Sequence, residues 1–506
     1  MALLQVLLFL LLCALALGWL SRRVNLPYPI ALVIGGSLLG FVPGLPQLEF
    51  DPQFLLVLVL PPILYQAALL TSWRDFKANL KPIGFLAIGM VIVTTLAVGA
   101  VLKLLVPGIP WAVAFVFGAI VSPPDAVAAT AVLSRYNIPH RVVVVLEGES
   151  LVNDASGLVL YKFAVAAVLT GMFSLAEARV QFALVAAGGI ALGMVMAWVF
   201  VQLHRHIGDP FIEVLVSMSI PYAAYIAAES VHLSGVLAVV AAGLFRGRHA
   251  PKMVSAEMRI LARSAWNILV FLLNSFVFIL IGLQLQGVLG RLGNYSAGEL
   301  ALTSFAVCAV AIGVRFLLVY PAAVAPRLAG EREPPPRGQL FIVSWCGMRG
   351  IVSLAAALAL PLETFDGEGF PYRDLIIFLT FVVIFVTLVG QGLTLAPIIR
   401  RLGLGSEAGQ QADIVRARAS MGQAAIEAVE RLAAEKGLEP ALTARVRAEF
   451  AEKVVADAQS EAARALRLAA LRAERAELIR VWQLNHISDD VLHHLEEELD
   501  YQESRL

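Results

Sequence analysis

Long apolar segments alternate with short polar loops over the first 400 residues. A bilayer-spanning helix needs ~20 mostly apolar residues. Because the first segment has no basic residue before its apolar run and no clear cleavage site after it, we expect a helix there and not a signal peptide. The ninth segment is short, and its boundary with the eighth is indistinct. The pattern predicts about thirteen transmembrane helices, at residues 2–20, 28–44, 52–70, 83–105, 111–133, 142–170, 182–203, 210–229, 232–245, 266–287, 299–323, 339–361 and 374–399.

The last hundred residues follow a different pattern. Residues 417–480 are rich in Ala, Glu, Arg and Leu, which are strong helix formers. Gly437 and Pro440 predict a turn between two helices, and Ser488 is a good N-cap for a third, short helix. We expect a helical tail that either stabilises the rest of the protein or regulates it.

Composition separates the same two parts. The chain of 506 residues is 59% hydrophobic and 15% charged, whereas soluble globular chains are ~25% charged. Half of the 38 acidic residues nevertheless lie after Gly405. We therefore predict an all-α, polytopic membrane protein, with a transmembrane domain at 1–402 and a cytoplasmic helical tail at 403–506.

Lys and Arg are distributed unevenly between the loops. One alternate set of loops holds sixteen of them and the other set holds three, Arg179, Arg291 and Arg373. Because Lys and Arg accumulate in cytoplasmic loops, the bias predicts an N-terminus outside and a C-terminus in the cytoplasm, in a multi-pass protein of the cell (plasma) membrane. An odd number of spans agrees with that orientation.

The fifth segment contains the run Ser122-Pro123-Pro124-Asp125. Two prolines in mid-span remove backbone donors and clash with the preceding turn, so the helix must open there. Open backbone at this depth is tolerated only where it faces protein or water. The sequence predicts freed carbonyls and a half-helix N-terminus beside the carboxylate of Asp125, although the aspartate could also be only a helix cap.

A second polar cluster lies in the sixth segment. Glu149 and Asn153 are four residues apart, as are Ser150 and Asp154, so these side chains share one helix face. Carboxylate, hydroxyl and amide oxygens suit a hard cation. A carboxylate buried beside other acidic groups is costly to leave charged, so it holds either a proton or a metal ion. That competition is the physical basis of antiport; a purely structural polar network is the alternative.

Arg349 lies in the twelfth segment, between Gly347 and Gly350. A lone buried cation is prohibitively costly, so it needs a carboxylate or carbonyl partner; Glu149 is the first choice and Glu147 the second. Interrupted segments at matched positions, here the fifth and the twelfth, suggest inverted repeats around a midplane site.

These motifs, in this order, resemble the sodium/proton exchanger family, the NhaP/NHE-like branch of the monovalent cation:proton antiporters, in its bacterial type with a short cytoplasmic tail. The motifs are Leu60–Ala68, Ser122–Ala128, Gly148–Ala155 and Gly347–Gly350, with support from 233–239 and 273–285. The resemblance implies a homodimer of thirteen-helix protomers, in which the fifth and twelfth helices cross at the ion site.

The resemblance also implies site roles. Asp154 is the cation- and proton-binding carboxylate, Asp125 and the carbonyl of Pro124 lie beside it, and Ser150 is a further metal ligand. Asn153, where electrogenic relatives have an aspartate, implies electroneutral exchange. This chain departs from the family's commoner Asp-Pro order, since its prolines precede Asp125, which leaves the carbonyl ligands open.

Three more residues in the spans carry charge. Glu149 is expected to form a structural ion pair with Arg349 near the site. Lys162 reads as a side chain that extends to the membrane surface, and Arg315 as a partner of Glu213 or Glu229.

The sequence thus predicts a secondary antiporter that exchanges Na⁺ (or Li⁺) for H⁺ without a cofactor. A K⁺/H⁺ antiporter of the same fold is the alternative, and a cation channel or a membrane ion sensor comes next. The chain has no phosphate loop, no His/Cys metal spacing and no nucleophile elbow, so we expect no enzyme. The partners expected are the cation, the proton, the bilayer and a second copy, with no nucleic acid.

Overall fold

The structure, a computed structural model, is described here for residues 2–24, 26–42, 52–136, 138–171, 175–204, 206–207, 209–253, 256–290, 292, 295–328, 335–364, 367–404, 408–436, 439–455, 461–484, 495, 499 and 502. In these ranges the chain is helical apart from its loops, and one isolated antiparallel bridge joins Glu363 and Gly369. The chain divides into two compact units, Met1–Ser406 and Glu407–Leu506.

The first unit is a bundle of helices. It comprises α1 (Ala2–Arg23), α2 (Tyr28–Gly40), α3 (Pro52–Leu70), α4 (Trp73–Ala78), α5 (Leu80–Gly84), η1 (Phe85–Met90), α6 (Val91–Leu105), α7 (Trp111–Val121), α8 (Ala126–Leu133), α9 (His140–Thr170), α10 (Leu175–His204), α11 (Pro210–Ser230), α12 (Gly235–Met253), α13 (Ala256–Gly290), α14 (Ala297–Leu328), α15 (Arg337–Trp345), α16 (Ile351–Leu358), α17 (Arg373–Phe385), η2 (Val386–Gln391) and α18 (Gly392–Leu402). Here η1 and η2 are π-helical stretches that continue into α6 and α18.

Eight of the described helical stretches are long and apolar enough to cross a membrane: Leu80–Leu105, Trp111–Leu133, His140–Thr170, Val180–His204, Pro210–Ser230, Met258–Gln284, Ala297–Val324 and Arg373–Leu402. Two shorter apolar helices, Tyr28–Gly40 and Val57–Leu70, accompany them. This confirms the all-α, polytopic fold class, while the count of thirteen spans stays a prediction. The short ninth segment is longer than expected, since α12 continues to Met253.

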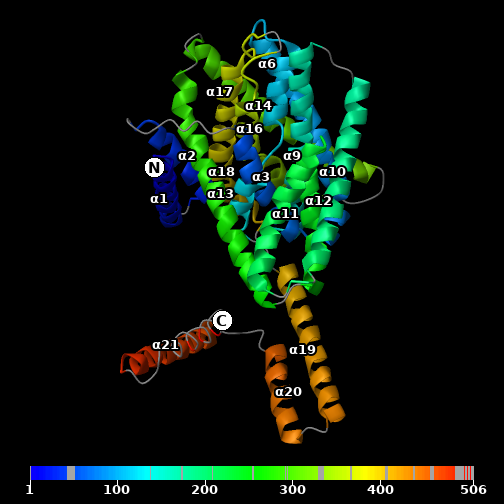
Figure 1. The fold of residues 1–506 in the computed structure, drawn as a ribbon, viewed down its shortest axis with the longest axis vertical. Coiled ribbons are helices and arrows are strands. Elements are labelled where there is room, and N and C mark those ends of the chain that lie inside the picture. Colours follow the sequence, from blue (N-terminus) through cyan, green and yellow to red (C-terminus); the bar gives the residue numbers. More distant parts are fainter. Residues whose placement is uncertain are drawn as a thin grey trace. The chain divides into compact units, whose positions relative to one another are not determined.

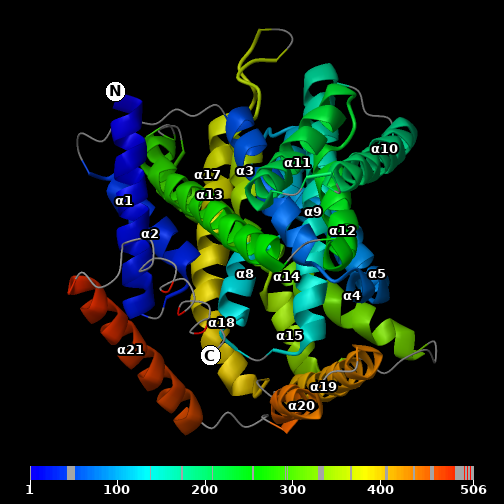
Figure 2. The ribbon, with the colours of Figure 1, turned by 60° about the horizontal axis from the view of Figure 1, so that its bottom comes forward.

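Helix packing places one pair of interrupted helices inside the bundle. In both views α1 and α2 lie at one side of this unit and α10 at the other (Figures 1 and 2). Helix α7 packs against α6, α9 and α16, and α16 also contacts α3 and α17. The residues of α7 and α16 are accordingly almost all buried. The two breaks described below therefore lie inside protein and not against lipid, as open backbone at this depth requires.

The second unit contains α19 (Ala408–Lys436), α20 (Pro440–Val455) and α21 (Glu461–Gln483). Helices α19 and α20 pack on each other, and Arg447 and Glu430 approach to 3.5 Å between them. The predicted turn separates these two helices, because α19 ends at Lys436 and α20 begins at Pro440. The described residues of the second predicted helix form α20 and α21, and residues 456–460 between them lie outside the described ranges. The helix predicted from Ser488 lies mostly outside the described residues.

Candidate functional site

The first break separates α7 from α8 at Ser122–Asp125. Pro123 and Pro124 have no N–H to donate, so carbonyls in the last turn of α7 lose their helical partners. The Ser122 hydroxyl donates to one of them, the oxygen of Ala119, at 3.1 Å. The Pro124 carbonyl accepts from Nδ2 of Asn153 at 2.7 Å. The open backbone predicted from the two prolines is therefore present, and side chains satisfy part of it.

The second break separates α15 from α16 between Trp345 and Ile351. The guanidinium of Arg349, which lies in this break, is only 2% exposed. It donates to three backbone carbonyls: those of Val121 at 2.9 Å, Ala311 at 3.2 Å and Gly347. The buried cation is thus compensated by carbonyl dipoles, the second of the two kinds of partner that the sequence required.

The two broken helices exchange backbone partners where they cross. In a continuous helix the Val121 carbonyl would accept from the Asp125 N–H. Here Arg349 takes the place of that donor, and the Asp125 N–H donates instead to the carbonyl of Met348 at 2.6 Å. Gly350 permits this approach, because a Cβ on it would lie 1.9 Å from Oδ2 of Asp125. The crossing therefore joins α7–α8 and α15–α16 into one body.

Asp125 lies at the N-termini of both second half-helices. Its carboxylate accepts from the backbone N–H of Val127, in the first turn of α8, at 2.8 Å. The backbone N–H of Ile351, the first residue of α16, donates to the same carboxylate. Helix N-termini favour anions because their N–H groups are unpaired and their dipoles point at the charge. Two such termini converge on this one aspartate.

Helix α9 brings the second carboxylate to the same place. Ser150 accepts from the N–H of Ala126 at 3.2 Å, and Asn153 donates to Pro124, so both predicted ligands contact the first break. Asp154 follows on this face; it is 6% exposed and interacts electrostatically with Asp125. In the described part of the chain no group donates a hydrogen bond to the Asp154 carboxylate. The structure thus gathers Asp125, Ser150, Asn153 and Asp154.

One amide oxygen in this group lacks a partner. Oδ1 of Asn153 is buried without a hydrogen bond among the described residues, although Nδ2 of the same side chain is bonded. A buried acceptor without a donor is costly.

Gly157, one turn after Asn153, lets the break approach α9, because a Cβ there would lie 2.9 Å from Cγ of Pro123.

The predicted ion pair between Glu149 and Arg349 is wrong. Both oxygens of Glu149 accept from Arg315 of α14 instead, at 2.5 Å for Nη1 and 2.6 Å for Nη2. Such a fork is the preferred geometry of an arginine with a carboxylate. Arg349 does not need the charge, because three carbonyls already surround it. Glu149 therefore forms its ion pair with Arg315, and both of its oxygens are engaged.

The expectations for the other charged residues are also corrected. Arg315 pairs with neither Glu213 nor Glu229: Glu229 lies 3.0 Å from Lys162, and Glu213 lies 3.1 Å from His204. Lys162 has a largely exposed side chain, as expected of a side chain that extends to the membrane surface. It also has an acidic partner, Glu229. Of the two basic residues Lys162 and Arg315, Arg315 is the buried one, and its partner Glu149 is bidentate.

The structure adds two groups that the motifs did not indicate. The hydroxyl of Thr387 in η2 accepts from the backbone N–H of Arg349 at 3.0 Å, and the carbonyl of Met348 holds Asp125. A threonine within an apolar run gives no sequence signal by itself. A backbone carbonyl gives none at all, so only the fold reveals these contacts.

The donor set at the crossing suits a small hard cation. It offers two carboxylates, a hydroxyl, an amide oxygen and the carbonyls of a broken helix, all of which are oxygen ligands. No cluster of three His, Cys, Asp or Glu side chains that could hold a metal exists in the described ranges. Two acidic side chains, Asp125 and Asp154, meet at the crossing.

Three comparisons relate the chain to known proteins. A family model described as "Sodium/hydrogen exchanger, transmembrane" matches residues 7–401. An uncharacterised Na⁺/H⁺ exchanger of Mycobacterium tuberculosis is 33% identical over 509 residues, covering 96% of this chain and 93% of that protein. The sodium, potassium, lithium and rubidium/H⁺ antiporter of Bacillus subtilis is 34% identical over 381 residues, covering 72% of this chain and 56% of that protein.

A solved structure shares the fold. The sodium proton antiporter MjNhaP1 from Methanocaldococcus jannaschii matches with a TM-score of 0.63 and 20% identity, over 80% of this chain and 100% of that chain. At this identity the likeness establishes the arrangement of the helices and nothing about the ligands.

Proposed function

Because the chain belongs to the sodium/hydrogen exchanger family, we propose that it exchanges a monovalent metal cation for protons across the membrane, with Na⁺ as the preferred cation. One observation carries the proposal: a pair of carboxylates meets where two interrupted helices cross, and none of the described residues donates a hydrogen bond to the second of them, Asp154. Family membership supports cation/proton antiport, and the geometry supports the assignment of residues.

The two aspartates have different tasks. The N–H groups of Val127 and Ile351 offset part of the cost of burying a charge on Asp125, which suits this carboxylate to a role beside the cation. Asp154 has no such donors, so a proton or a cation must neutralise it. Ser150, Asn153 and the carbonyl of Pro124 complete the oxygen ligands around the ion. A proton on Asp154 then excludes the cation, and a bound cation excludes the proton.

The crossing explains how the site could be carried as a unit. Arg349 bonds the end of α7 and the carbonyl of Ala311 in α14, while Asp125 bonds Met348. These contacts connect both interrupted helices with their neighbour, so the ligands keep their geometry when this body moves against the other helices. Such motion gives access to one side of the membrane at a time.

We assign electroneutral exchange, one cation for one proton. Asn153 supplies an uncharged side chain next to Asp154, and it holds the Pro124 carbonyl. A second carboxylate at this position, binding and releasing a proton of its own, would add one charge to each transport cycle. With only Asp154 titrating, each step carries one positive charge in either direction.

Potassium is the second candidate cation. The Bacillus subtilis relative is named for sodium, potassium, lithium and rubidium, and oxygen ligands suit each of these ions.

The protein acts as a carrier and not as an enzyme. It forms a homodimer in the plasma membrane, with its N-terminus outside and its tail in the cytoplasm, as the loop charges favour.

Cation-driven proton movement in proteoliposomes tests the proposal. The rate is measured for Na⁺, Li⁺ and K⁺, with the membrane potential clamped and unclamped. We expect exchange fastest with Na⁺ and the same rate at every potential. Asp154→Asn abolishes it, while Glu229→Gln, a carboxylate outside the site, does not. Exchange by Asp154→Asn at the wild-type rate would contradict the site, and current insensitive to proton gradients would indicate a channel.

A further inference from the structure

A cavity of about 710 Å³ opens between α5, η1, α9, α14 and α15, apart from the aspartate pair. Small-ligand pockets usually span ~300–1,000 Å³. Its deeper wall is apolar and comes from buried side chains, among them Val145, Val319, Leu340 and Val343. Leu80 and Phe85, at 46% and 39% exposure, continue this apolar surface outward. A ligand that fills the cavity must therefore have a substantial apolar part.

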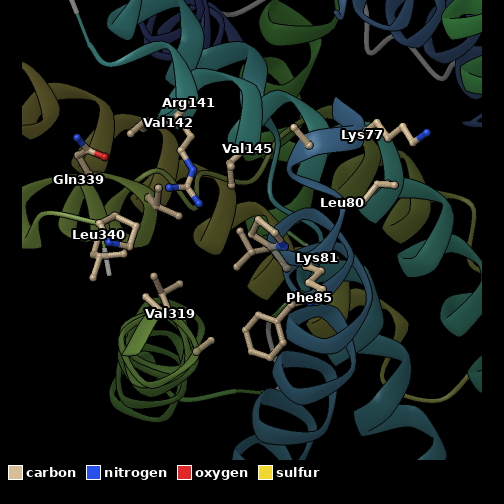
Figure 3. Close-up of a pocket in the computed structure, with 17 residues that line it drawn as sticks. Lys77, Leu80, Lys81, Phe85, Arg141, Val142, Val145, Val319, Gln339 and Leu340 are labelled. Carbon is tan, nitrogen blue, oxygen red and sulfur yellow. The ribbon is translucent and has the colours of Figure 1, made fainter. Parts of the chain in front are cut away.

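The charged side chains in the described lining of the cavity are all cationic. Lys77, Lys81 and Arg141 belong to it, and none of the described lining residues is acidic. Figure 3 shows the Arg141 side chain turned into the space between Leu340 and Val145, and Lys77 at the edge. Arg141 uses its Nε to donate to Asn79 at 3.2 Å, which fixes the side chain and leaves its terminal nitrogens available to a ligand.

Nearby acidic groups do not cancel this charge. Asp75 is engaged by His140 at 3.1 Å, and the hydrogen bonds from His140 and from Ser72 hold the pKa of that carboxyl below its usual range. Among the described residues, Lys77, Lys81 and Arg141 form no ion pair with an acidic side chain, so they present a positive rim above an apolar interior.

The position of the rim favours a lipid over a soluble ligand. All three cations lie in the set of loops that is rich in Lys and Arg, at one end of the transmembrane helices. Trp73, in α4 beside Lys77, is 37% exposed, and tryptophan is enriched at membrane–water interfaces. Basic pockets between transmembrane helices bind anionic headgroups at this level. An inorganic anion would use the rim and leave the apolar wall empty.

We propose that this cavity binds an anionic phospholipid from the leaflet next to the Lys/Arg-rich loops. Its phosphate lies against Arg141 and Lys81, with Lys77 at the outer edge, and part of an acyl chain packs on Val319, Val343 and Phe85. The acyl chain then packs against α15, whose Val343 carbonyl accepts from Nε of Arg315 at 2.9 Å, and Arg315 in turn pairs with Glu149. Occupancy therefore stabilises the folded unit.

Native mass spectrometry and thermal unfolding of the delipidated full-length chain in neutral detergent test this proposal. The probes are dioleoyl phosphatidylglycerol, dioleoyl phosphatidylcholine and sodium phosphate. We expect one tightly retained phosphatidylglycerol, which raises the unfolding temperature more than either other probe. Lys81→Gln with Arg141→Gln should weaken its binding about 25-fold, since each cation near an anionic surface contributes ~1 kcal/mol.

Three variants make the result decisive. Arg248→Gln with Arg401→Gln removes two exposed charges that do not line the cavity, and it should change the affinity less than about threefold. Ala322→Phe fills the apolar part; it should abolish lipid binding and leave the response to phosphate unchanged, and it keeps the test valid if the charge variant fails to fold. Lys81→Arg with Arg141→Lys should retain binding.

Several outcomes would overturn the proposal. An equal loss in the Arg248/Arg401 control would mean diffuse attraction to surface charge. Protection by phosphate equal to that by phosphatidylglycerol would assign the rim to a free anion. Unchanged lipid binding in Ala322→Phe would mean that no acyl chain enters the cavity.

Discussion

Glu149→Gln tests the buried ion pair between Glu149 and Arg315, which the structure shows in place of the predicted pair between Glu149 and Arg349. Glu149 and Arg315 are 1% and 2% exposed, and both carboxylate oxygens accept from the guanidinium. The variant leaves the Arg315 charge buried without a counter-charge; one amide oxygen at position 149 and the Val343 carbonyl remain as neutral acceptors, and the new NH₂ group faces the guanidinium as a second donor. Breaking a buried pair from one side costs ~3–5 kcal/mol. Replacing both partners, as in Glu149→Leu with Arg315→Met, should leave the free energy of unfolding nearly unchanged, because no uncompensated charge then remains buried.

A double-mutant cycle separates Arg315 from Arg349 as the partner. Glu149 contacts Arg315 directly, so we expect a coupling free energy of about 3 kcal/mol between them. The guanidinium of Arg349 donates to three carbonyls and not to Glu149. Its coupling to Glu149 should be less than half as large, so the cost of Arg349→Gln should change by less than about 1.5 kcal/mol between the wild-type and Glu149→Gln backgrounds.

The assay is the free energy of unfolding of the purified protein in mixed micelles, titrated with sodium dodecyl sulfate. Glu229→Gln is the matched control, because it neutralises a carboxylate whose partner Lys162 is largely exposed and should cost no more than ~1 kcal/mol. The reasoning would be refuted by equal losses in Glu149→Gln and Glu229→Gln, or by a stronger coupling of Glu149 to Arg349 than to Arg315.

Other predictions follow from the crossing. Gly350→Ala places a Cβ against Asp125, so it should lower the free energy of unfolding by ~1–3 kcal/mol and the exchange rate at least tenfold. Gly313→Ala, with nothing within 4 Å of its Cβ, should leave both quantities unchanged. Equal behaviour of the two variants would refute the close approach. Asn153→Asp should make exchange in proteoliposomes depend on membrane potential, and Asn153→Ala, which loses the same hydrogen bond without adding charge, should not. Arg349→Lys should slow exchange about tenfold or more, because an ammonium cannot reproduce the planar fork that spans the carbonyls; an unchanged rate would show that the fork is dispensable.

The sequence predicts the fold class and both helix breaks because strong local rules act there. Long apolar runs are helical in lipid, and two prolines in mid-span open a helix wherever they occur. The family resemblance is confirmed by the family match. The grouping of Ser150, Asn153 and Asp154 follows from helix periodicity alone. These features depend on neighbours within a few residues, so the chain itself encodes them.

Pairings between distant helices are not local, and there the prediction failed. Glu149 and Arg315 are 166 residues apart. From the sequence, either buried arginine could meet this glutamate, and charge alone does not choose between them. The choice depends on where the carbonyls freed at the two breaks lie, because those of Val121 and Gly347 satisfy Arg349. Backbone groups carry no residue identity, so the sequence does not reveal such contacts.

The most direct test of the central claim is the number of protons released when the cation binds. The account requires that a cation and a proton compete for Asp154. At a pH low enough for the ion-free carboxylate to be protonated, Na⁺ added to the purified wild-type protein in weakly buffered solution should therefore release close to one proton per ion bound. Below the pH at which the carboxylate ionises, the apparent affinity for Na⁺ should fall about tenfold for each unit by which the pH is lowered. Asp154→Asn should release none. Sodium binding that releases no proton from the wild-type protein, with an affinity independent of pH, would contradict the account.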